Sequence, residues 1–196
     1  MKMVGTGAMY RAVGLYMLRN QININDPKAI AEHVCDADIT VRYEGGAQHI
    51  YLEGKDVSEA IRTPDASMAA SKVSAVPAVR ERLVELQRKI AEGQNVVMDG
   101  RDIGTHVLPN ATLKIYLTAS VEVRARRRQM ELEGKGQSEP YEKVLSDMIE
   151  RDYTDMHRKA SPLRPAEDSK HVDSSDLTFD EVVGLLEKMA RAAIGG

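Results

Sequence analysis

The sequence predicts an α/β fold in which a parallel sheet is flanked by helices and a small antiparallel lobe is inserted. Short apolar runs that indicate buried strands alternate with helical patterns along most of the chain, as in parallel α/β sheets. That rhythm is interrupted at residues 39–43 and 48–52, which alternate and flank Glu44-Gly45-Gly46-Ala47, a β-hairpin signal. We therefore expect a core of residues 1–37 and 92–196 around an inserted lobe of residues 38–91.

The expected helices follow from apolar spacing and from capping residues. They span residues 7–20, 28–35, 77–92, 121–132, 141–159 and 179–193. Pro77 opens the third helix and Ser120 caps the fourth, while Thr178 with Glu181 forms a capping box before the last. The polar, glycine-rich stretch around residues 132–141 is typical of a mobile lid loop.

Two buried strands are expected at residues 95–98 and 112–117, and a last strand is expected near residues 170–173. The first, Val96-Val97-Met98, has the continuous apolar pattern of a strand buried on both faces. It stops at Asp99-Gly100 and is followed by Arg101 and Asp102. Because ligands of open α/β sheets bind beyond the carboxyl ends of the strands, Arg101 and Asp102 are candidate site residues.

Composition narrows the class of protein. The chain has 196 residues, of which 42% are hydrophobic and 29% charged, as in ordinary globular proteins. A net charge of only −3 argues against a nucleic-acid partner, and no apolar run is long enough for a membrane span. The single cysteine excludes a disulfide framework. We expect a soluble cytoplasmic protein.

Charged residues on one predicted helix form the first candidate cluster. Arg151, Asp155 and Arg158 are spaced i, i+4, i+7 and so share one stripe. An exposed ladder of salt bridges is one interpretation. If they converged with Arg101, Asp102 and Arg11, the same residues would instead make a phosphate and sugar site.

Two further clusters have similar alternatives. Thr6-Gly7 with Tyr10-Arg11 could present backbone N–H groups and a guanidinium to an anion, or could be a helix cap with a surface arginine. Ser71 and Arg80 could be polar site residues, although Arg80 could also be a solvated arginine.

Four other features each have a simpler structural interpretation. Arg124 and Arg126–Arg128 indicate an exposed helix face or a phosphate-facing lid rather than a nucleic-acid patch. The histidines lack metal-ligand spacing, so no metal site is expected. Cys35 is expected to be a buried, inert thiol. Four side chains at helical spacing are interpreted as core: Met9, Tyr10, Tyr16 and Met17.

Taken in order, these residues resemble the bacterial cytidylate kinases, which are P-loop nucleoside-monophosphate kinases. The resemblance covers essentially the whole chain. Its motifs are Thr6-Gly7-Ala8-Met9-Tyr10-Arg11-Ala12, Ile61-Arg62-Thr63, Ser71, Val79-Arg80, Asp99-Gly100-Arg101-Asp102-Ile103-Gly104-Thr105 and Glu150-Arg151-Asp152.

The resemblance implies transfer of the γ-phosphoryl group of ATP, with Mg²⁺, to CMP or dCMP by a monomeric enzyme. It implies that the CMP phosphate is held by Arg11, Arg101 and Arg158, and that cytosine is read by Ser71, Arg80 and Asp102. The sugar would be held by Arg151 with Asp155, and Thr6 is a further implied CMP-binding residue. Arg127 would lie near ATP and, with Arg101 and Arg158, would serve catalysis. A carboxylate beside an arginine fork matches the donor and acceptors of the cytosine edge.

One departure stands out, because the family opens with a strand and a G-x-x-x-x-G-K loop that this sequence lacks. Neither Gly54-Lys55 nor Gly134-Lys135 has the required upstream glycine, since His49 and Gln129 occupy those positions. Gly5 also stands where the family has an aspartate, so similarity is expected from Thr6 onward. A start chosen too late is favoured over a genuine loss of the ATP site, because the monophosphate-site residues are all present.

The loss of a central strand would expose apolar side chains of the parallel sheet.

Three other functions stay open. The chain could be a catalytically inactive CMP-binding protein or a kinase of another monophosphate such as UMP. Nucleic-acid binding is the weakest alternative.

Overall fold

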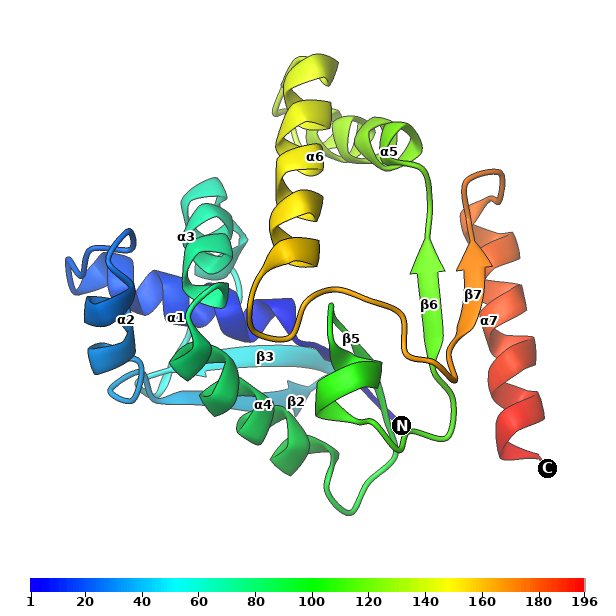
Figure 1. Ribbon diagram of the computed structural model, residues 1–196, viewed down its shortest axis with the longest axis horizontal. Helices are drawn as coiled ribbons and strands as arrows, with labels where there is room; N and C mark the ends of the chain where they lie inside the picture. Colours follow the sequence, from blue (N-terminus) through cyan, green and yellow to red (C-terminus); the bar gives the residue numbers. More distant parts are fainter. Residues whose placement is uncertain (196) are drawn as a thin grey trace. The chain divides into compact units, whose positions relative to one another are not determined.

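A computed structural model describes residues 1–195 and divides into two compact units, which are treated separately below (Figure 1). Unit 1 comprises Met1–Val107 with Arg158–Pro162, and unit 2 comprises the rest of the described chain. The inserted lobe of residues 38–91 stays a prediction. Its hairpin residues Ile39, Ile50 and Leu52 pack in the same hydrophobic cluster as the first helix.

Unit 1 contains two small sheets. Strands β1 (Lys2–Gly5) and β5 (Val96–Asp99) pair in parallel, with Gly5 opposite Asp99. Strands β2 (Ile39–Glu44), β3 (Ala47–Leu52) and β4 (Lys55–Asp56) form an antiparallel sheet, which confirms the predicted hairpin. Gly45 and Gly46 have φ of 57° and 82°, the left-handed backbone that a tight hairpin turn requires.

The helices of unit 1 are α1 (Gly7–Arg19), α2 (Pro27–His33), α3 (Pro64–Ser74) and α4 (Pro77–Ala91), with short turns η1 (Ala60–Arg62) and η2 (Ile103–Val107). Helix α1 packs closely on α3, since a Cβ on Gly14 would lie 2.8 Å from the Ala69 Cβ. Met9, Val13, Tyr16 and Met17 are buried, as their spacing predicts.

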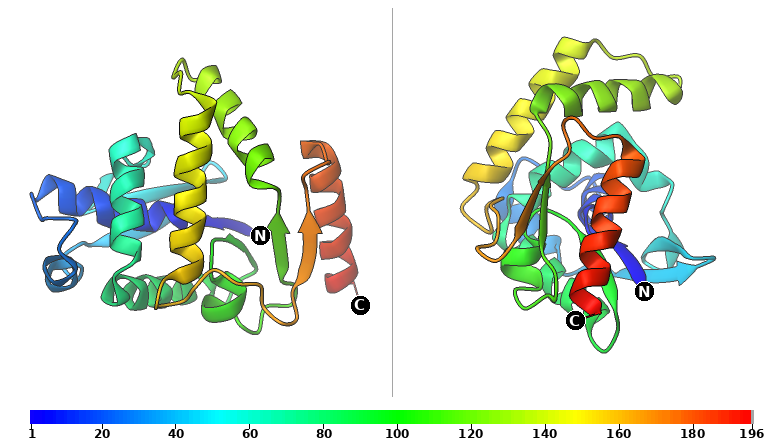
Figure 2. Two further views of the ribbon diagram at one scale, coloured as in Figure 1. Left: turned by 45° about the horizontal axis from the view of Figure 1, so that its top comes forward. Right: turned by 90° about the vertical axis from the view of Figure 1, so that its right-hand side faces the viewer.

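Unit 2 holds a second parallel pair, β6 (Ile115–Thr118) and β7 (Lys170–Asp173), with helix α7 (Phe179–Ile194) running beside β7 (Figures 1 and 2). Helices α5 (Val121–Gly134) and α6 (Tyr141–His157) pack on each other through Ala125, Leu132 and Val144. The Thr178–Glu181 capping box and the Ser120 cap are both present, as predicted.

Several expectations need correction. Strand β1 was not predicted, because its Lys-Met-Val-Gly sequence offers only one buried side chain, Val4. Helix α3 was also missed, since its inner face consists mainly of alanines that give little apolar periodicity. The Thr63 hydroxyl and Pro64, which begin α3, were the available signals.

Burial was also overestimated at three positions. Val97 in β5 is 41% exposed and Leu117 in β6 is 49% exposed, because each belongs to a two-stranded sheet. Burial on both faces of these strands is therefore wrong. Cys35 lies in the turn after α2 and is exposed rather than buried. No helix within residues 1–195 has the length and apolar character needed to cross a membrane.

Candidate functional site

The site begins where β1 and β5 end side by side. The Thr6 backbone N–H and hydroxyl both donate to the Asp99 carbonyl, at 3.2 and 2.8 Å. Thr6 is the N-cap residue of α1, as that interpretation predicts, but its hydroxyl makes no capping hydrogen bond to the helix. Gly100 follows at a point where a Cβ would overlap the Thr6 hydroxyl and would lie 2.8 Å from the Ile103 Cδ1. Only glycine fits there, so the chain can turn toward Asp102.

Arg80 and Asp102 form a buried ion pair at this turn. Arg80 Nη2 donates to Asp102 Oδ2, and the two side chains are only 4% and 5% exposed. Arg80 Nη1 also donates to the Ser74 carbonyl at 3.2 Å. The interpretation of Arg80 as a solvated arginine is therefore wrong. Two buried charges carry a large desolvation cost, which their mutual attraction and further hydrogen bonds must offset.

Tyr10 packs against the core, as its helical spacing predicts, and also contacts this ion pair. Its ring centroid lies 5.5 Å from the Arg80 guanidinium carbon, within the range of a cation–π contact. Burial raises the pKa of Tyr10, Asp102 raises it further, and Arg80 and Arg158 oppose the shift. The phenol is therefore neutral at physiological pH. A tyrosine directly before Arg11 was the only sequence signal for this placement.

The remaining predicted residues of unit 1 lie on neighbouring elements. Arg101 is exposed just beyond β5, and Arg11 is half-buried in α1. Ser71 is half-buried in α3, where its carbonyl accepts the Ser74 hydroxyl at 2.9 Å. Since the Ser74 carbonyl binds Arg80, the end of α3 supports the ion pair through its backbone.

Asp99 adds a second carboxyl group at the end of β5. Burial raises its pKa, while its own backbone N–H and Arg101 act in the opposite direction. Among residues 1–195 no three His, Cys, Asp or Glu side chains gather as a metal site.

Arg158 also belongs to unit 1, and its Nε donates to the Ser161 carbonyl at 2.8 Å. Arg151 and Asp155 lie on α6 in unit 2. Arg151 is exposed, whereas Asp155 is only 8% exposed, so a fully exposed ladder is wrong. The grouping of Arg151 and Asp155 with the residues of unit 1 stays a prediction.

Arg127, on α5, contacts the corner between β7 and α7. Its guanidinium donates to the carbonyls of Ser174 and Leu177 at 2.6 and 3.2 Å, and to the Ser174 hydroxyl at 3.2 Å. Its neighbour Arg124 pairs with Asp152 at 2.6 Å. Arg126–Arg128 are exposed, as predicted for this helix face.

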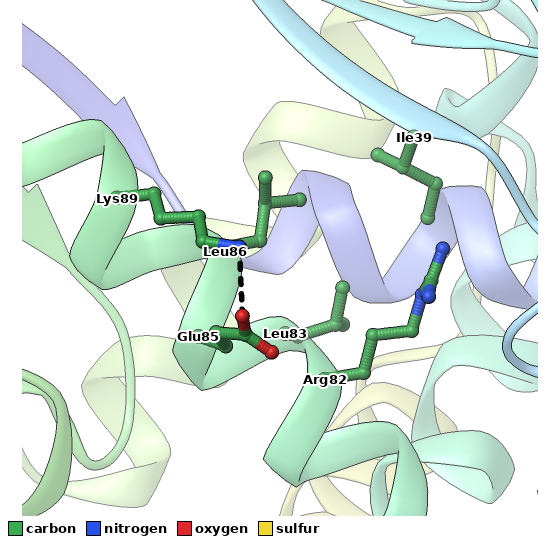
Figure 3. A pocket seen from close by; sticks show the side chains of 6 residues that line it. All are labelled: Ile39, Arg82, Leu83, Glu85, Leu86 and Lys89. Carbon is green, nitrogen blue, oxygen red and sulfur yellow. Dashed lines mark ion pairs between the residues drawn. The ribbon is translucent and has the colours of Figure 1, made fainter.

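A small pocket beside α4 contains none of the candidate site residues in its lining, which consists of Ile39, Arg82, Leu83, Glu85, Leu86 and Lys89 (Figure 3). Its volume of about 170 Å³ is below the usual range for ligand sites. Its charges are already engaged, since Lys89 pairs with Glu85 at 2.7 Å and Arg82 donates to the Ala37 carbonyl at 2.9 Å. The candidate site is therefore the Thr6–Asp99–Asp102 edge rather than this pocket.

Comparison with known proteins gives one consistent result. The family model described as cytidylate kinase matches residues 1–192, so the expectation that similarity begins at Thr6 is wrong. A cytidylate kinase of Caldicellulosiruptor bescii is 51% identical over 180 residues, which are 92% of this chain and 80% of that protein. One from Caldanaerobacter subterraneus subsp. tengcongensis is also 51% identical, over 92% of this chain and 79% of that protein. One from Lactobacillus gasseri is 46% identical, over 95% and 81%.

Proposed function

This chain belongs to the cytidylate kinase family, and we propose that it transfers the γ-phosphoryl group of ATP to CMP or dCMP. The products are ADP and CDP or dCDP. The observation that carries the proposal is the buried Arg80–Asp102 pair at the carboxyl ends of β1 and β5. Ligands of α/β sheets bind at such an edge, and a charge pair held out of water there is suited to reading a polar base.

Base choice follows from the hydrogen-bonding groups of the pair. Cytosine presents an amine donor beside N3 and O2 acceptors. A carboxylate accepts from the amine, while a guanidinium donates to the ring acceptors. Uracil presents a carbonyl in place of the amine, so Asp102 would face an oxygen. A buried mismatch of this kind costs on the order of 1–3 kcal/mol.

The arginines supply the charge that phosphoryl transfer needs. Arg11, Arg101 and Arg158 hold the CMP phosphate in this proposal, and Arg101 and Arg158 also neutralise charge on the transferred group. Arg151 and Asp155 hold the sugar. Catalysis of phosphoryl transfer is mostly positioning and charge stabilisation, so fixed guanidinium groups serve both purposes. Support comes from Arg101, which follows β5 after Gly100, and from Arg158, whose Nε donates to the Ser161 carbonyl.

The ATP side rests on fewer residues. We place Arg127 near ATP, although its guanidinium also binds the carbonyls at the start of α7. Mg²⁺ bound to nucleotide phosphates needs only one or two protein carboxylates and neutralises phosphate charge. Asp99, which ends β5, is our candidate for such a carboxylate, although burial raises its pKa and so works against metal binding. We also propose that the protein is a cytoplasmic monomer.

The test separates binding from turnover. ADP production is measured with ATP, Mg²⁺ and each of CMP, dCMP and UMP, and CMP binding is measured by calorimetry. If the reading frame continues upstream of Met1, the extended protein is assayed beside this chain, because this sequence lacks a G-x-x-x-x-G-K loop. We expect turnover with CMP and little with UMP. CMP binding without turnover in every form would favour the inactive CMP-binding protein, and equal use of UMP would favour another monophosphate kinase.

A further inference from the structure

Helix α4 contacts the segment that begins at Asp102 in two places. Arg80 reaches the Asp102 carboxylate, and Arg88, two turns later, reaches the far end of η2. The two arginines are eight residues apart, which is about 12 Å along a helix axis. Gln87 lies between these contacts and is 1% exposed. The Asp102–Val107 segment is therefore fixed to one rigid helix at both of its ends.

Arg88 satisfies the last carbonyls of η2. Its Nε donates to the Val107 carbonyl at 3.1 Å, and its Nη2 donates to the His106 carbonyl. The final carbonyls of any helical turn have no partner within that turn. A guanidinium can bind two of them at once because its donors form a planar fork, whereas an ammonium is a single point of contact.

The backbone of Asp102 is part of the same turn. Its carbonyl accepts the N–H groups of His106 and Val107 at 2.9 and 3.3 Å, and the Thr105 hydroxyl at 3.3 Å. A movement of His106 and Val107 is therefore passed directly to the backbone of Asp102. Because Arg80 holds only the carboxylate, the orientation of that carboxylate depends on both contacts.

We propose that Arg88 is a positioning residue for base discrimination: by fixing the end of η2 it holds Asp102 in the orientation that distinguishes cytosine from uracil. This inference rests on the proposed function, since it assigns Arg88 to the same base-reading group. Arg88 acts through η2 and is not placed in contact with the nucleotide.

The experiment compares CMP and UMP affinities by calorimetry, which requires no turnover. Arg88→Met removes both hydrogen bonds, and Arg88→Lys keeps the charge but not the fork. The matched control is Arg82→Met, since Arg82 also joins α4 to a backbone carbonyl, that of Ala37, at 2.9 Å. Thermal unfolding of each variant is recorded alongside.

We expect the ratio of CMP to UMP affinity to fall roughly fivefold in Arg88→Met, the equivalent of about one hydrogen bond. Arg88→Lys should lie between Arg88→Met and the unmodified chain, and Arg82→Met should keep the original ratio. An unchanged ratio in Arg88→Met, or an equal fall in Arg82→Met, would overturn the inference and leave the proposed function intact. If the unmodified chain itself shows no preference for CMP, the proposed function fails and the inference falls with it.

Discussion

The two units differ in how far they bury their apolar side chains and their ion pairs. Unit 1 has a cluster of buried side chains drawn from both of its sheets and all four of its helices, and it buries the Arg80–Asp102 pair. Unit 2 has a small cluster between α5 and α6, and none of the described residues of α7 is fully buried. Its Arg124–Asp152 pair is 33% and 19% exposed.

This difference in packing suits two different roles, a rigid binding site and a moving segment. A binding group that must hold one orientation needs a dense surrounding core, because packing fixes side chains in single rotamers. Elements with few buried apolar contacts open at a lower free-energy cost, and moving parts of binding proteins are drawn from such elements. Unit 1 therefore suits the reading of the base. The thinner packing of α5 and α6 suits the lid expected around residues 132–141.

The largest expected effect is on the buried ion pair. Arg80→Met leaves the Asp102 carboxylate buried and uncompensated, so the free energy of unfolding should fall by about 3–5 kcal/mol. Arg124→Met removes the corresponding partner in unit 2, where water screens the charges, and should cost about 1 kcal/mol or less. Chemical denaturation measures both values.

A double substitution tests whether the loss of stability in Arg80→Met comes from the unpaired charge of Asp102. The double substitution Arg80→Met with Asp102→Leu removes both charges and should regain most of the lost stability, while base discrimination stays lost. Equal losses in Arg80→Met and Arg124→Met would show that the two units do not differ in how they hold charge.

Truncation of a leucine in each unit is expected to have the next largest effect. Leu83 in α4 is fully buried, so Leu83→Ala should cost about 2–5 kcal/mol. Leu117 in β6 is 49% exposed, so Leu117→Ala should change stability by about 0.5 kcal/mol or less. Hydrogen exchange measures protection in each unit separately, and Leu83→Ala should lower it in unit 1. A large loss from Leu117→Ala would mean that β6 is better buried than its exposed side chain indicates.

Much of the fold followed from local signals that do not depend on distant packing. A few adjacent residues predict each of three features, namely the hairpin, the Pro77 helix start and the Thr178–Glu181 capping box. All three are present. Strand β1 and the exposure of Val97 were not predictable in this way. Both depend on which strands pair, and pairing between residues about a hundred positions apart leaves no local pattern.

The site shows the same limit. The position of Arg101 and Asp102 at a strand end was readable from the apolar run that stops at Asp99. The burial of Arg80 was not readable from the sequence, because Arg80 lies off the apolar stripe of α4. It is buried because it pairs with Asp102, which comes from another segment of the chain. Tyr10 packs against the core, as its helical spacing predicts, but the contact of its ring with Arg80 leaves no local pattern in the sequence.

The smallest expected effect tests whether the units also differ at their surfaces. Asp56, in unit 1, has its pKa lowered to about 2 by the Ser58 hydroxyl and N–H and by His49. Glu181, in unit 2, has its pKa lowered by the Thr178 backbone N–H and hydroxyl. A carboxyl whose folded pKa is below its unfolded value adds stability above the unfolded pKa, and this is lost as the pH falls through the folded pKa.

Asp56→Asn and Glu181→Gln should therefore each lower stability at pH 6. For Asp56→Asn the difference from the unmodified chain should shrink between about pH 4 and pH 2. For Glu181→Gln it should shrink as the pH falls below the unfolded pKa of glutamate, about 4.3. Urea unfolding at a series of pH values measures both differences. Because both carboxylates are exposed and held by hydrogen bonds from nearby residues, the two units should respond alike. If only the Asp56→Asn difference depended on pH, the contrast between the units would extend from their interiors to their surfaces.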